Sequence, residues 1–501
     1  MPRLKPRDIF FDHHLIYKGD EIDSVVADMW QLIEQQWKGK RIRDKESHIN
    51  SLKVLILNLF NAYRTDVDMP IGVPRTTNYY TKSPLGATAT LNVLDMLIKL
   101  GYVKQVRKGV HKNFGSTALG NKAVQSRTGA YKSTKKIHNY FGRLNLYRLK
   151  INLNSFDSIR VGNKESKTVQ PEVNETYMAM KQSLSKINNY YDSIHIDLFV
   201  TDEELTTIRR QMSHKEVREE WMETKEDMIL RDLNFRRKYL HRKFYDNTYR
   251  LHGRFYGGYW EGLPSEWRQR LTINGKLTSE IDFTNMHFAI LYHEIGEKMT
   301  NQGDLYDLSE TVPEWKGLPI EKLKVYRKQV KLIMNYMINC EDDEQVKGVI
   351  EKNRKKIFTR TPKGFTWQGL IDFIKEIHSP IADKFYRNQG IRLMNLDSQI
   401  LEKVILKGID NDVCVLGVHD SCIFKHEHQH KVMTWMVEAY EEVVGKYGKT
   451  IKWDIFRLDH LQPLADLQDK DISSYLLRLQ EWNIHRQSYG DSSLPLLPPM
   501  P

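Results

Sequence analysis

Apolar residues recur at helical spacing in the first fifth of the chain. Residues 51–60 read SLKVLILNLF, and a second apolar series runs from Leu91 to Ile98. Spacings of three and four residues place such side chains on one face of a helix, so the pattern predicts two amphipathic helices. The segment between them, residues 70–81, contains two prolines and a glycine and predicts a non-helical connection.

Residues 100–119 alternate apolar and basic positions, which predicts a short basic hairpin with a glycine-containing tip. Two helices followed by a basic ribbon resemble a winged helix-turn-helix domain. In that case one helix would fit the major groove of DNA while cations of the ribbon contact phosphates. The candidate cations are Lys104, Arg107, Lys108 and Lys112. The alternative is a small helical domain with a solvated basic loop.

The middle of the chain changes character twice. Residues 127–153 interleave cations with aromatic rings, a pattern that either tracks nucleic acid or is a solvated face. Residues 172–245 are highly charged with helical periodicity and predict long helices that form an elongated arm. After Tyr249 the chain is richer in glycine, aromatic residues and short apolar runs that predict strands. The proline-rich residues 492–501 predict an extended end.

Composition narrows the class of protein. The 501 residues include 76 lysines and arginines against 64 aspartates and glutamates, a net charge of +12. Such a charge either keeps a protein soluble or serves an anionic partner, most simply nucleic acid. The three cysteines are too scattered for a disulfide scaffold. No apolar run approaches the ~20 residues of a membrane helix. We therefore expect a cytoplasmic protein without a membrane segment.

Candidate chemistry begins at residues 251–258, LHGRFYGG. A glycine before Arg254 permits close backbone approach, and the arginine supplies a forked cation for a phosphate or a base edge. A glycine-rich turn is the simpler interpretation of this segment alone.

A second candidate segment lies at residues 277–292. It predicts a strand that ends at Phe283, followed by a helix from Asn285. Asp282 would then lie at the strand end beside the free carbonyl of Phe283, which is a natural site for a hard cation. The alternative is that Asp282 caps the following helix.

The third segment, residues 326–340, predicts a helix with one polar stripe. Arg327, Lys331, Asn335 and Asn339 are spaced four residues apart, which is about one helical turn. Two cations one turn apart suit a triphosphate, and the amides beyond them could reach a sugar or a base. A solvated face is the alternative, but asparagine is a poor helix former in an otherwise apolar helix.

The fourth segment, residues 412–424, predicts a hairpin of two apolar strands. His419 and Asp420 form its polar tip. An ordinary polar turn is the alternative. Asp282 and Asp420 together would supply two strand-borne carboxylates with a cation-bearing helix between them in the chain. Two-metal phosphoryl transfer needs this combination: carboxylates hold two Mg²⁺ or Mn²⁺ ions, and Lys331 stabilises the leaving group.

The order of these segments resembles that of the superfamily containing family A DNA polymerases and phage-type single-subunit RNA polymerases. HGRFY resembles the Gly-Arg motif that precedes the palm, and EIDFTNMH resembles motif A. RKQVKLIMNYMIN resembles motif B, and VHDS resembles motif C in its RNA-polymerase form. NLDSQI lies where a polar helix precedes motif C. The resemblance covers about a third of the chain.

The resemblance implies a role for each matching residue. It implies metal ligation by Asp282 and Asp420, triphosphate contacts by Arg327 and Lys331, and a position for His419 near the primer end. Contacts to the duplex, primer or template are implied for Arg254, Asp397 and Ser398. Residues at three further positions depart from the family pattern and leave sugar selection open: His287, where the DNA enzymes have glutamate, and Asn335 and Asn339.

We therefore expect an α+β protein with a right-hand polymerase core, an antiparallel palm sheet and helical fingers and thumb. The expected regions are a winged-helix-like domain (1–125), a basic linker and thumb-like arm (126–245), the palm and fingers (246–470) and a tail (471–501). The expected activity is DNA-templated nucleotidyl transfer from nucleoside triphosphates, as in a small RNA polymerase or primase of a phage or mobile element. A DNA polymerase, a non-catalytic DNA-binding regulator and a metal-dependent nuclease remain alternatives.

Overall fold

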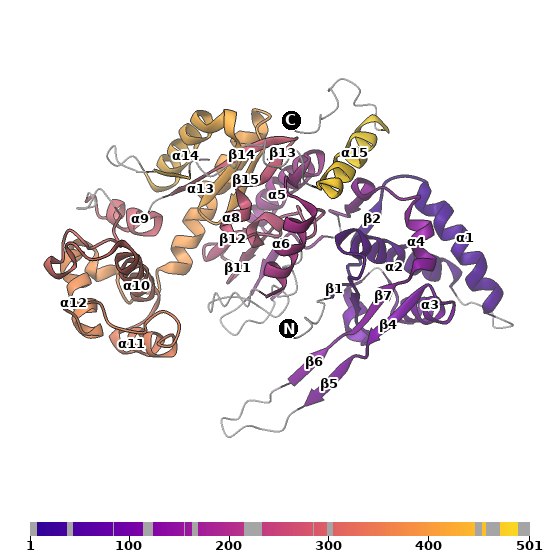
Figure 1. Ribbon diagram of the computed structural model, residues 1–501, viewed down its shortest axis with the longest axis horizontal. Coiled ribbons are helices and arrows are strands. Elements are labelled where there is room, and N and C mark those ends of the chain that lie inside the picture. The colour runs from indigo at the N-terminus through magenta and orange to yellow at the C-terminus, as the bar shows by residue number, and fades with distance from the viewer. Residues whose placement is uncertain are drawn as a thin grey trace.

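Mixed helical and strand structure characterises the protein, and the described strands form five sheets. Figure 1 shows three parts: an N-terminal lobe, a central sheet region, and a lobe formed by α10, α11 and α12 on the far side. The computed structural model describes residues 8–37, 44–83, 85–113, 124–154, 156–162, 169–214, 233–283, 285–297, 304–445, 453–456 and 471–488.

The N-terminal lobe combines helices with a four-stranded sheet of order β1-β3-β7-β4. Its first elements are β1 (Ile9–Phe10), β2 (Leu15–Tyr17), α1 (Glu21–Gln36), α2 (Lys45–Thr65), β3 (Ile71–Val73), η1 (Thr77–Lys82) and α3 (Ala87–Lys99). Both helices predicted from apolar spacing are confirmed, since α2 contains residues 51–60 and α3 contains Leu91 to Ile98. Their buried faces pack into one apolar core.

The predicted hairpin within residues 100–119 is wrong in its pairing. The strands concerned are β4 (Val103–Arg107), β5 (Val110–Asn113), β6 (Val124–Arg127) and β7 (Gly129–Ser133). β4 pairs with β7 and β5 pairs with β6, so β4 and β5 lie on the same arm of a longer ribbon. Gly109 does not take the positive φ that a tight turn there needs. The phosphate-contact roles proposed for the ribbon cations stay predictions.

Most aromatic residues of segment 127–153 are buried. After β7 they form α4 (Lys135–Phe141), η2 (Leu146–Arg148) and β8 (Leu149–Ile151), which pairs with β2. The rings of Tyr131, Phe141 and Tyr147 are at most 2% exposed. These three rings therefore belong to the protein core, and bases cannot stack on them, whereas Tyr140 is only partly buried.

The central sheet has the order β10-β13-β14-β16-β15, and β17 also pairs with β14. Its strands are β10 (Ile196–Leu198), β13 (Leu271–Ile273), β14 (Lys276–Phe283), β15 (Val415–Val418), β16 (Ser421–Lys425) and β17 (Trp453–Phe456). Every pair in it is antiparallel. The predicted strand ending at Phe283 and the predicted hairpin within residues 412–424 are both confirmed.

The expected helical arm is helical only in part. α5 (Glu175–Ser193) and α6 (Asp202–His214) confirm the periodicity of residues 172–245. β10 lies between them and joins the central sheet. A three-stranded sheet of order β12-β11-β9 is formed by β9 (Ile159–Val161), β11 (His241–Phe244) and β12 (His252–Tyr256). The arm is therefore built into the sheet region, because its short apolar runs pair with strands that follow it in the chain.

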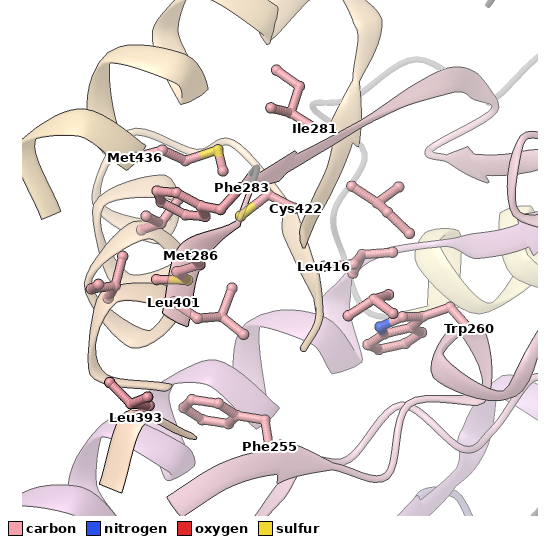
Figure 2. Close-up of a cluster of buried hydrophobic side chains, with 14 of the residues drawn as sticks. Phe255, Trp260, Ile281, Phe283, Met286, Leu393, Leu401, Leu416, Cys422 and Met436 are labelled. Carbon is pink, nitrogen blue, oxygen red and sulfur yellow. The ribbon is translucent and has the colours of Figure 1, made fainter. Parts of the chain in front are cut away.

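Helices cover the central strands and join them to β12. They are α9 (Met286–Glu294), α13 (Gly390–Asp410) and α14 (Gln429–Val444). α13 packs against β12, β15 and α14. Figure 2 shows the resulting core, in which Phe255 of β12 and Leu393 of α13 lie below Phe283 and Cys422 of the sheet. All four side chains are at most 5% exposed.

The third lobe consists of α10 (Ile320–Asn339), α11 (Asp343–Lys352) and α12 (Trp367–Ile377). α10 confirms the helix predicted for residues 326–340. Short helical elements lie between these strands and helices along the chain: η3 (Tyr259–Gly262), α8 (Ser265–Arg268), η4 (Pro313–Trp315), η5 (Ser379–Lys384) and η6 (His426–His428).

The last described helix, α15 (Ser473–Ser488), lies between the N-terminal lobe and the central region. Arg478 makes an ion pair at 2.9 Å with buried Asp197 of β10, while Glu481 accepts a hydrogen bond at 2.9 Å from Arg64 of α2. The two large apolar cores span residues 11–149 and 159–440, so the chain divides between Leu149 and Ile159. No described helix has both the length and the apolar character needed to cross a bilayer.

Gly253 should be intolerant of any side chain. Its φ is +83°, and a Cβ there would lie 2.7 Å from the Phe244 ring and 2.8 Å from the amide of Asn395 on α13. We expect Gly253→Ala to lower the free energy of unfolding by about 2–4 kcal/mol through strain and overpacking. Urea unfolding measures this change.

Gly348→Ala is the matched control, because Gly348 lies within α11 and a Cβ there meets open space. It should raise stability by up to about 1 kcal/mol. Equal effects of the two substitutions would contradict the close approach of β12 to α13.

Candidate functional site

The register of β14 against β16 brings the two predicted acidic residues together. Asp282 is the register partner of Ser421, the residue that follows Asp420. Val418 and Ser421 also pair, so His419 and Asp420 form a two-residue turn between β15 and β16. Asp282 and Asp420 therefore lie at the same end of two neighbouring strands, as the sequence predicts.

Two of the nine described non-glycine residues with a positive φ lie at this end of the sheet. His419, next to Asp420, has a φ of 58°, and Asn285, which begins α9 after β14, has a φ of 56°. The left-handed region costs a non-glycine residue about 1–2 kcal/mol. Such strained positions cluster at binding and catalytic sites, where the surrounding structure holds them.

Glu280 is a third carboxylate in this group, and the motif analysis did not single it out. It lies two residues before Asp282 on β14, so both residues are on the same face of the sheet. Arg268 binds it at 2.9 and 3.0 Å, and the hydroxyl of Ser421 donates to it at 2.7 Å. Burial, together with Asp282, Glu280 and Asp420, raises the pKa of the nearby Cys422 thiol. Glu280 and Asp282 are two positions apart in the predicted strand, and this spacing was the sequence signal that could have identified Glu280.

Tyr306 connects the acidic turn with the cations of α10. Both cations lie over the ring of Tyr306. Lys331 Nζ is 5.5 Å and Arg327 Cζ is 5.7 Å from the ring centroid. The same tyrosine is buried, and its burial, Asp420 and Asp304, with a smaller effect of Asp282, raise its pKa above the usual range. The two cations of α10 therefore lie over one aromatic ring, and Asp420 and Asp282 are close enough to act on its hydroxyl electrostatically.

The two cations differ in their availability. Arg327 forms an ion pair with Asp304. The side chain of Arg327 is 40% exposed and that of Asp304 is 32% exposed. Lys331 is exposed and has no acidic partner among the residues that the structure describes. Of the two cations, Lys331 is therefore the more available to an anionic ligand. Asp304 and Tyr306 lie in a segment without regular periodicity, so pattern analysis could identify neither residue.

Arg254, Asp397 and His287 form one connected group. Nε of Arg254 donates to both carboxylate oxygens of Asp397, at 3.2 and 3.1 Å. Nε2 of His287 lies 2.9 Å from Asp397 Oδ2. Burial opposes ionisation of Asp397, but Arg254 and His287 overcome this effect and lower its pKa. Burial lowers the pKa of Arg254, but Asp397 and, to a smaller extent, Asp420 raise it above its ordinary value, which indicates that the acidic turn lies near this group.

The predicted substrate contacts of Asp397 and Ser398 are wrong for this structure, because both side chains are at most 1% exposed. Asp397 instead holds Arg254 and His287. Ser398 Oγ accepts a hydrogen bond at 3.0 Å from buried Arg242, which also binds Glu402 at 2.6 Å. Both residues therefore act as positioning residues inside the fold. A polar residue on a helix can face a ligand or a buried cation, and spacing does not distinguish the two.

The polar stripe of α10 divides after Lys331. Asn335 follows one turn later and is half-buried. Asn339 donates to the backbone carbonyl of Asn335 at 2.7 Å, and a Cβ on Gly390 would lie 2.0 Å from its side-chain oxygen. Asn339 therefore packs against the start of α13, so its predicted substrate contact is not supported by this geometry.

Carboxylate oxygens around the turn fit Mg²⁺ or Mn²⁺, which prefer hard oxygen ligands. Asp282 and Asp420 are the residues that would hold such ions, since Glu280 is already bound by Arg268 and Ser421. Phe283, whose carbonyl is the remaining predicted ligand, ends β14 with its ring buried beside Tyr440. Its ligation stays a prediction.

Comparison with known proteins gives no family for this chain. No protein-family model matches it, and no curated protein sequence matches it significantly. The interpretation of the site therefore depends on its own geometry.

Arg254 and Asp397 should be strongly coupled in stability. The Asp397 side chain is fully buried and that of Arg254 is 15% exposed, so removing one partner leaves the other charge uncompensated. We expect Asp397→Asn alone to lower the free energy of unfolding by about 3–5 kcal/mol. The double variant Asp397→Asn/Arg254→Gln should lose less than the sum of the single changes.

A double-mutant cycle measured by urea unfolding gives the coupling directly. The control is the exposed pair Glu321 and Lys324 of α10, for which the coupling should stay below about 0.5 kcal/mol. Additive losses for Asp397 and Arg254 would contradict the buried ion pair.

Proposed function

We propose that the protein is a template-directed nucleotidyltransferase that adds nucleotides by two-metal phosphoryl transfer. One observation carries this proposal: strand register brings Asp282 and Asp420 to one end of the sheet. Arg327 and Lys331 lie over Tyr306, the tyrosine whose pKa both carboxylates raise. Acidic metal ligands and triphosphate-binding cations from distant parts of the chain thus share one site. This combination is the requirement of in-line transfer from a nucleoside triphosphate.

Each residue has a distinct task in this proposal. Bound Mg²⁺ or Mn²⁺ would supply activation of the attacking hydroxyl and neutralisation of the leaving pyrophosphate. Asp282 and Asp420 hold the ions, and Lys331 and Arg327 bind the triphosphate and stabilise its developing charge. Asp397 orients Arg254 and His287 beside the site. Asp304 limits the movement of Arg327 through their ion pair.

The arrangement of the lobes supports a right-hand polymerase core. In this proposal the central antiparallel sheet is the palm, and the lobe of α10, α11 and α12 is the fingers (Figure 1). α5 and α6 would belong to the thumb-like part. The sequence form of the His-Asp-Ser turn favours synthesis of RNA, as by a small DNA-dependent RNA polymerase or primase. A DNA polymerase with the same site is the runner-up.

A non-catalytic DNA-binding regulator is the second candidate, and one observation favours it. The N-terminal lobe has the element order α2, β3, η1, α3, β4, ribbon, β7, with sheet neighbours β3-β7-β4. That order is consistent with a winged helix-turn-helix domain, which would bind DNA in either protein. A regulator does not account for the acidic residues and cations around Tyr306.

The proposal is tested by an extension assay. Purified protein is incubated with single-stranded DNA, with or without an annealed primer, in Mg²⁺ and labelled NTPs or dNTPs. We expect unprimed or primed products that Asp420→Asn and Asp282→Asn each reduce by at least about 10²-fold, because each substitution removes a metal-ligand charge. Asp410→Asn, an exposed residue on α13 paired with Lys186, is the control and should leave activity unchanged.

The outcomes separate the candidates. Products from dNTPs alone would keep the nucleotidyltransferase and replace RNA synthesis by DNA synthesis. Degradation of labelled DNA without nucleotides, lost in Asp420→Asn, would indicate a nuclease. No incorporation under any condition, with DNA binding intact, would overturn the proposal in favour of the regulator.

Lys331 should act on nucleotide use and not on DNA binding. Lys331→Ala removes a charge-assisted contact to the triphosphate, so kcat/KM for the nucleotide should fall by roughly 10- to 10²-fold. Steady-state kinetics at varied nucleotide concentration measure it. Lys322→Ala is the matched control, because nine residues place this exposed lysine about 180° from Lys331 around α10. An equal effect of both substitutions would contradict the role of Lys331.

A further inference from the structure

An exposed cationic segment connects α11 and α12. Residues 352–364 read KNRKKIFTRTPKG and contain six cations and no acidic residue. The segment thus carries a charge of +6, whereas the net charge of the whole chain is +12. We call residues 352–364 the cationic turn. The six residues are Lys352, Arg354, Lys355, Lys356, Arg360 and Lys363, and all six are exposed.

These charges are poorly compensated. Arg354 pairs with Glu351 at 3.2 Å. The other five cations have no acidic partner among the residues that the structure describes. Like charges held close together repel each other. The segment therefore has an electrostatic cost that an anionic partner would remove.

Buried polar groups nevertheless hold the backbone of the cationic turn in place. The side chain of Gln329 on α10 is 1% exposed. Its Nε2 donates to the carbonyls of Ile357, at 2.9 Å, and Arg360, at 3.1 Å. The amide of Lys363 donates to Tyr326 Oη at 3.1 Å. A flexible solvated loop would not require such contacts.

A second set of contacts fixes the ends of the turn. Trp315 Nε1 donates to the carbonyl of Lys363 at 2.8 Å. Phe358 is 1% exposed and lies 5.3 Å from the ring of Trp367. The backbone is thus held from two sides while the cations remain in solvent. A backbone that is already held in place loses less conformational entropy when a partner binds to its side chains.

The cationic turn lies on the opposite side of α10 from the candidate site. Gln329 is two residues from both Arg327 and Lys331, and each residue advances a helix by about 100°. Its side chain therefore points roughly 160–200° away from theirs. The turn is a separate surface of the same helix, and not part of the triphosphate site.

We propose that the cationic turn binds the phosphate backbone of duplex nucleic acid without reading its sequence. Five unpaired cations and the exposed hydroxyls of Thr359 and Thr361 match phosphate oxygens. The only aromatic residue of the turn, Phe358, is buried, so no ring is offered for stacking single-stranded bases. The inference deepens the proposed function, on which it rests for its ligand: the template duplex.

The test measures binding of a labelled 20-base-pair DNA by fluorescence anisotropy over a salt series, with the full chain and without nucleotides. In Lys355→Ala/Lys356→Ala/Arg360→Ala, affinity should fall for every sequence tried. The slope of log affinity against log salt should shrink by about 2.7, since each phosphate contact contributes about 0.9. These side chains are exposed, so the melting temperature should be unchanged.

The matched control is Lys347→Ala/Lys403→Ala/Lys407→Ala, which removes the same charge from cations that pair with glutamates. Its slope should equal that of the unmodified protein. Equal losses in both triple variants, an unchanged slope in the first, or tighter binding of a single-stranded 20-mer would overturn the proposal. Asp420→Asn should retain the full slope, so failure of catalysis and failure of duplex binding are distinguishable.

Discussion

The register of β14 against β16 is the constraint on which the candidate site depends. A shift of one residue would move Asp282 to the other face of the sheet and away from Asp420. Apolar packing prevents this shift, because Ile281 and Cys422 are register partners and each is at most 1% exposed. Figure 2 shows both among the side chains that connect the sheet with its covering helices. The geometry of the acidic turn is thus set by the hydrophobic core.

Tyr306 keeps opposite charges close without letting them neutralise each other. Arg327 pairs with Asp304, and Lys331 remains without an acidic partner in the part of the chain that the structure describes, although both lie over the ring of Tyr306. Asp420 and Asp282 raise the pKa of the same tyrosine, so carboxylates and cations lie near one another, and in the proposed function the triphosphate and its metal ions would bind among them. Direct ion pairs would close the same site.

Local patterns in the sequence were sufficient for the strands, for α10 and for the positions of Asp282 and Asp420, because each depends on short-range periodicity. Tyr306 could not be found in this way, since its role arises only when its irregular segment packs on α10. Burial of Asp397 was equally invisible, because its partner Arg254 is 143 residues away. The basic ribbon is longer than the short hairpin expected within residues 100–119, because β4 and β5 pair with strands that follow residue 123.

Helix α15 has a consequence for how the protein assembles. Its ion pairs reach Arg64 and Asp197, which precede their partners by 417 and 281 residues. The N-terminal core is complete in the chain by Leu149, about 340 residues before the end of α15. At roughly 5–20 residues per second, ribosomal synthesis separates these events by about 17–70 s. During that interval the N-terminal lobe lacks its contact with α15, and the side chain of Arg64 on α2 is without its partner Glu481.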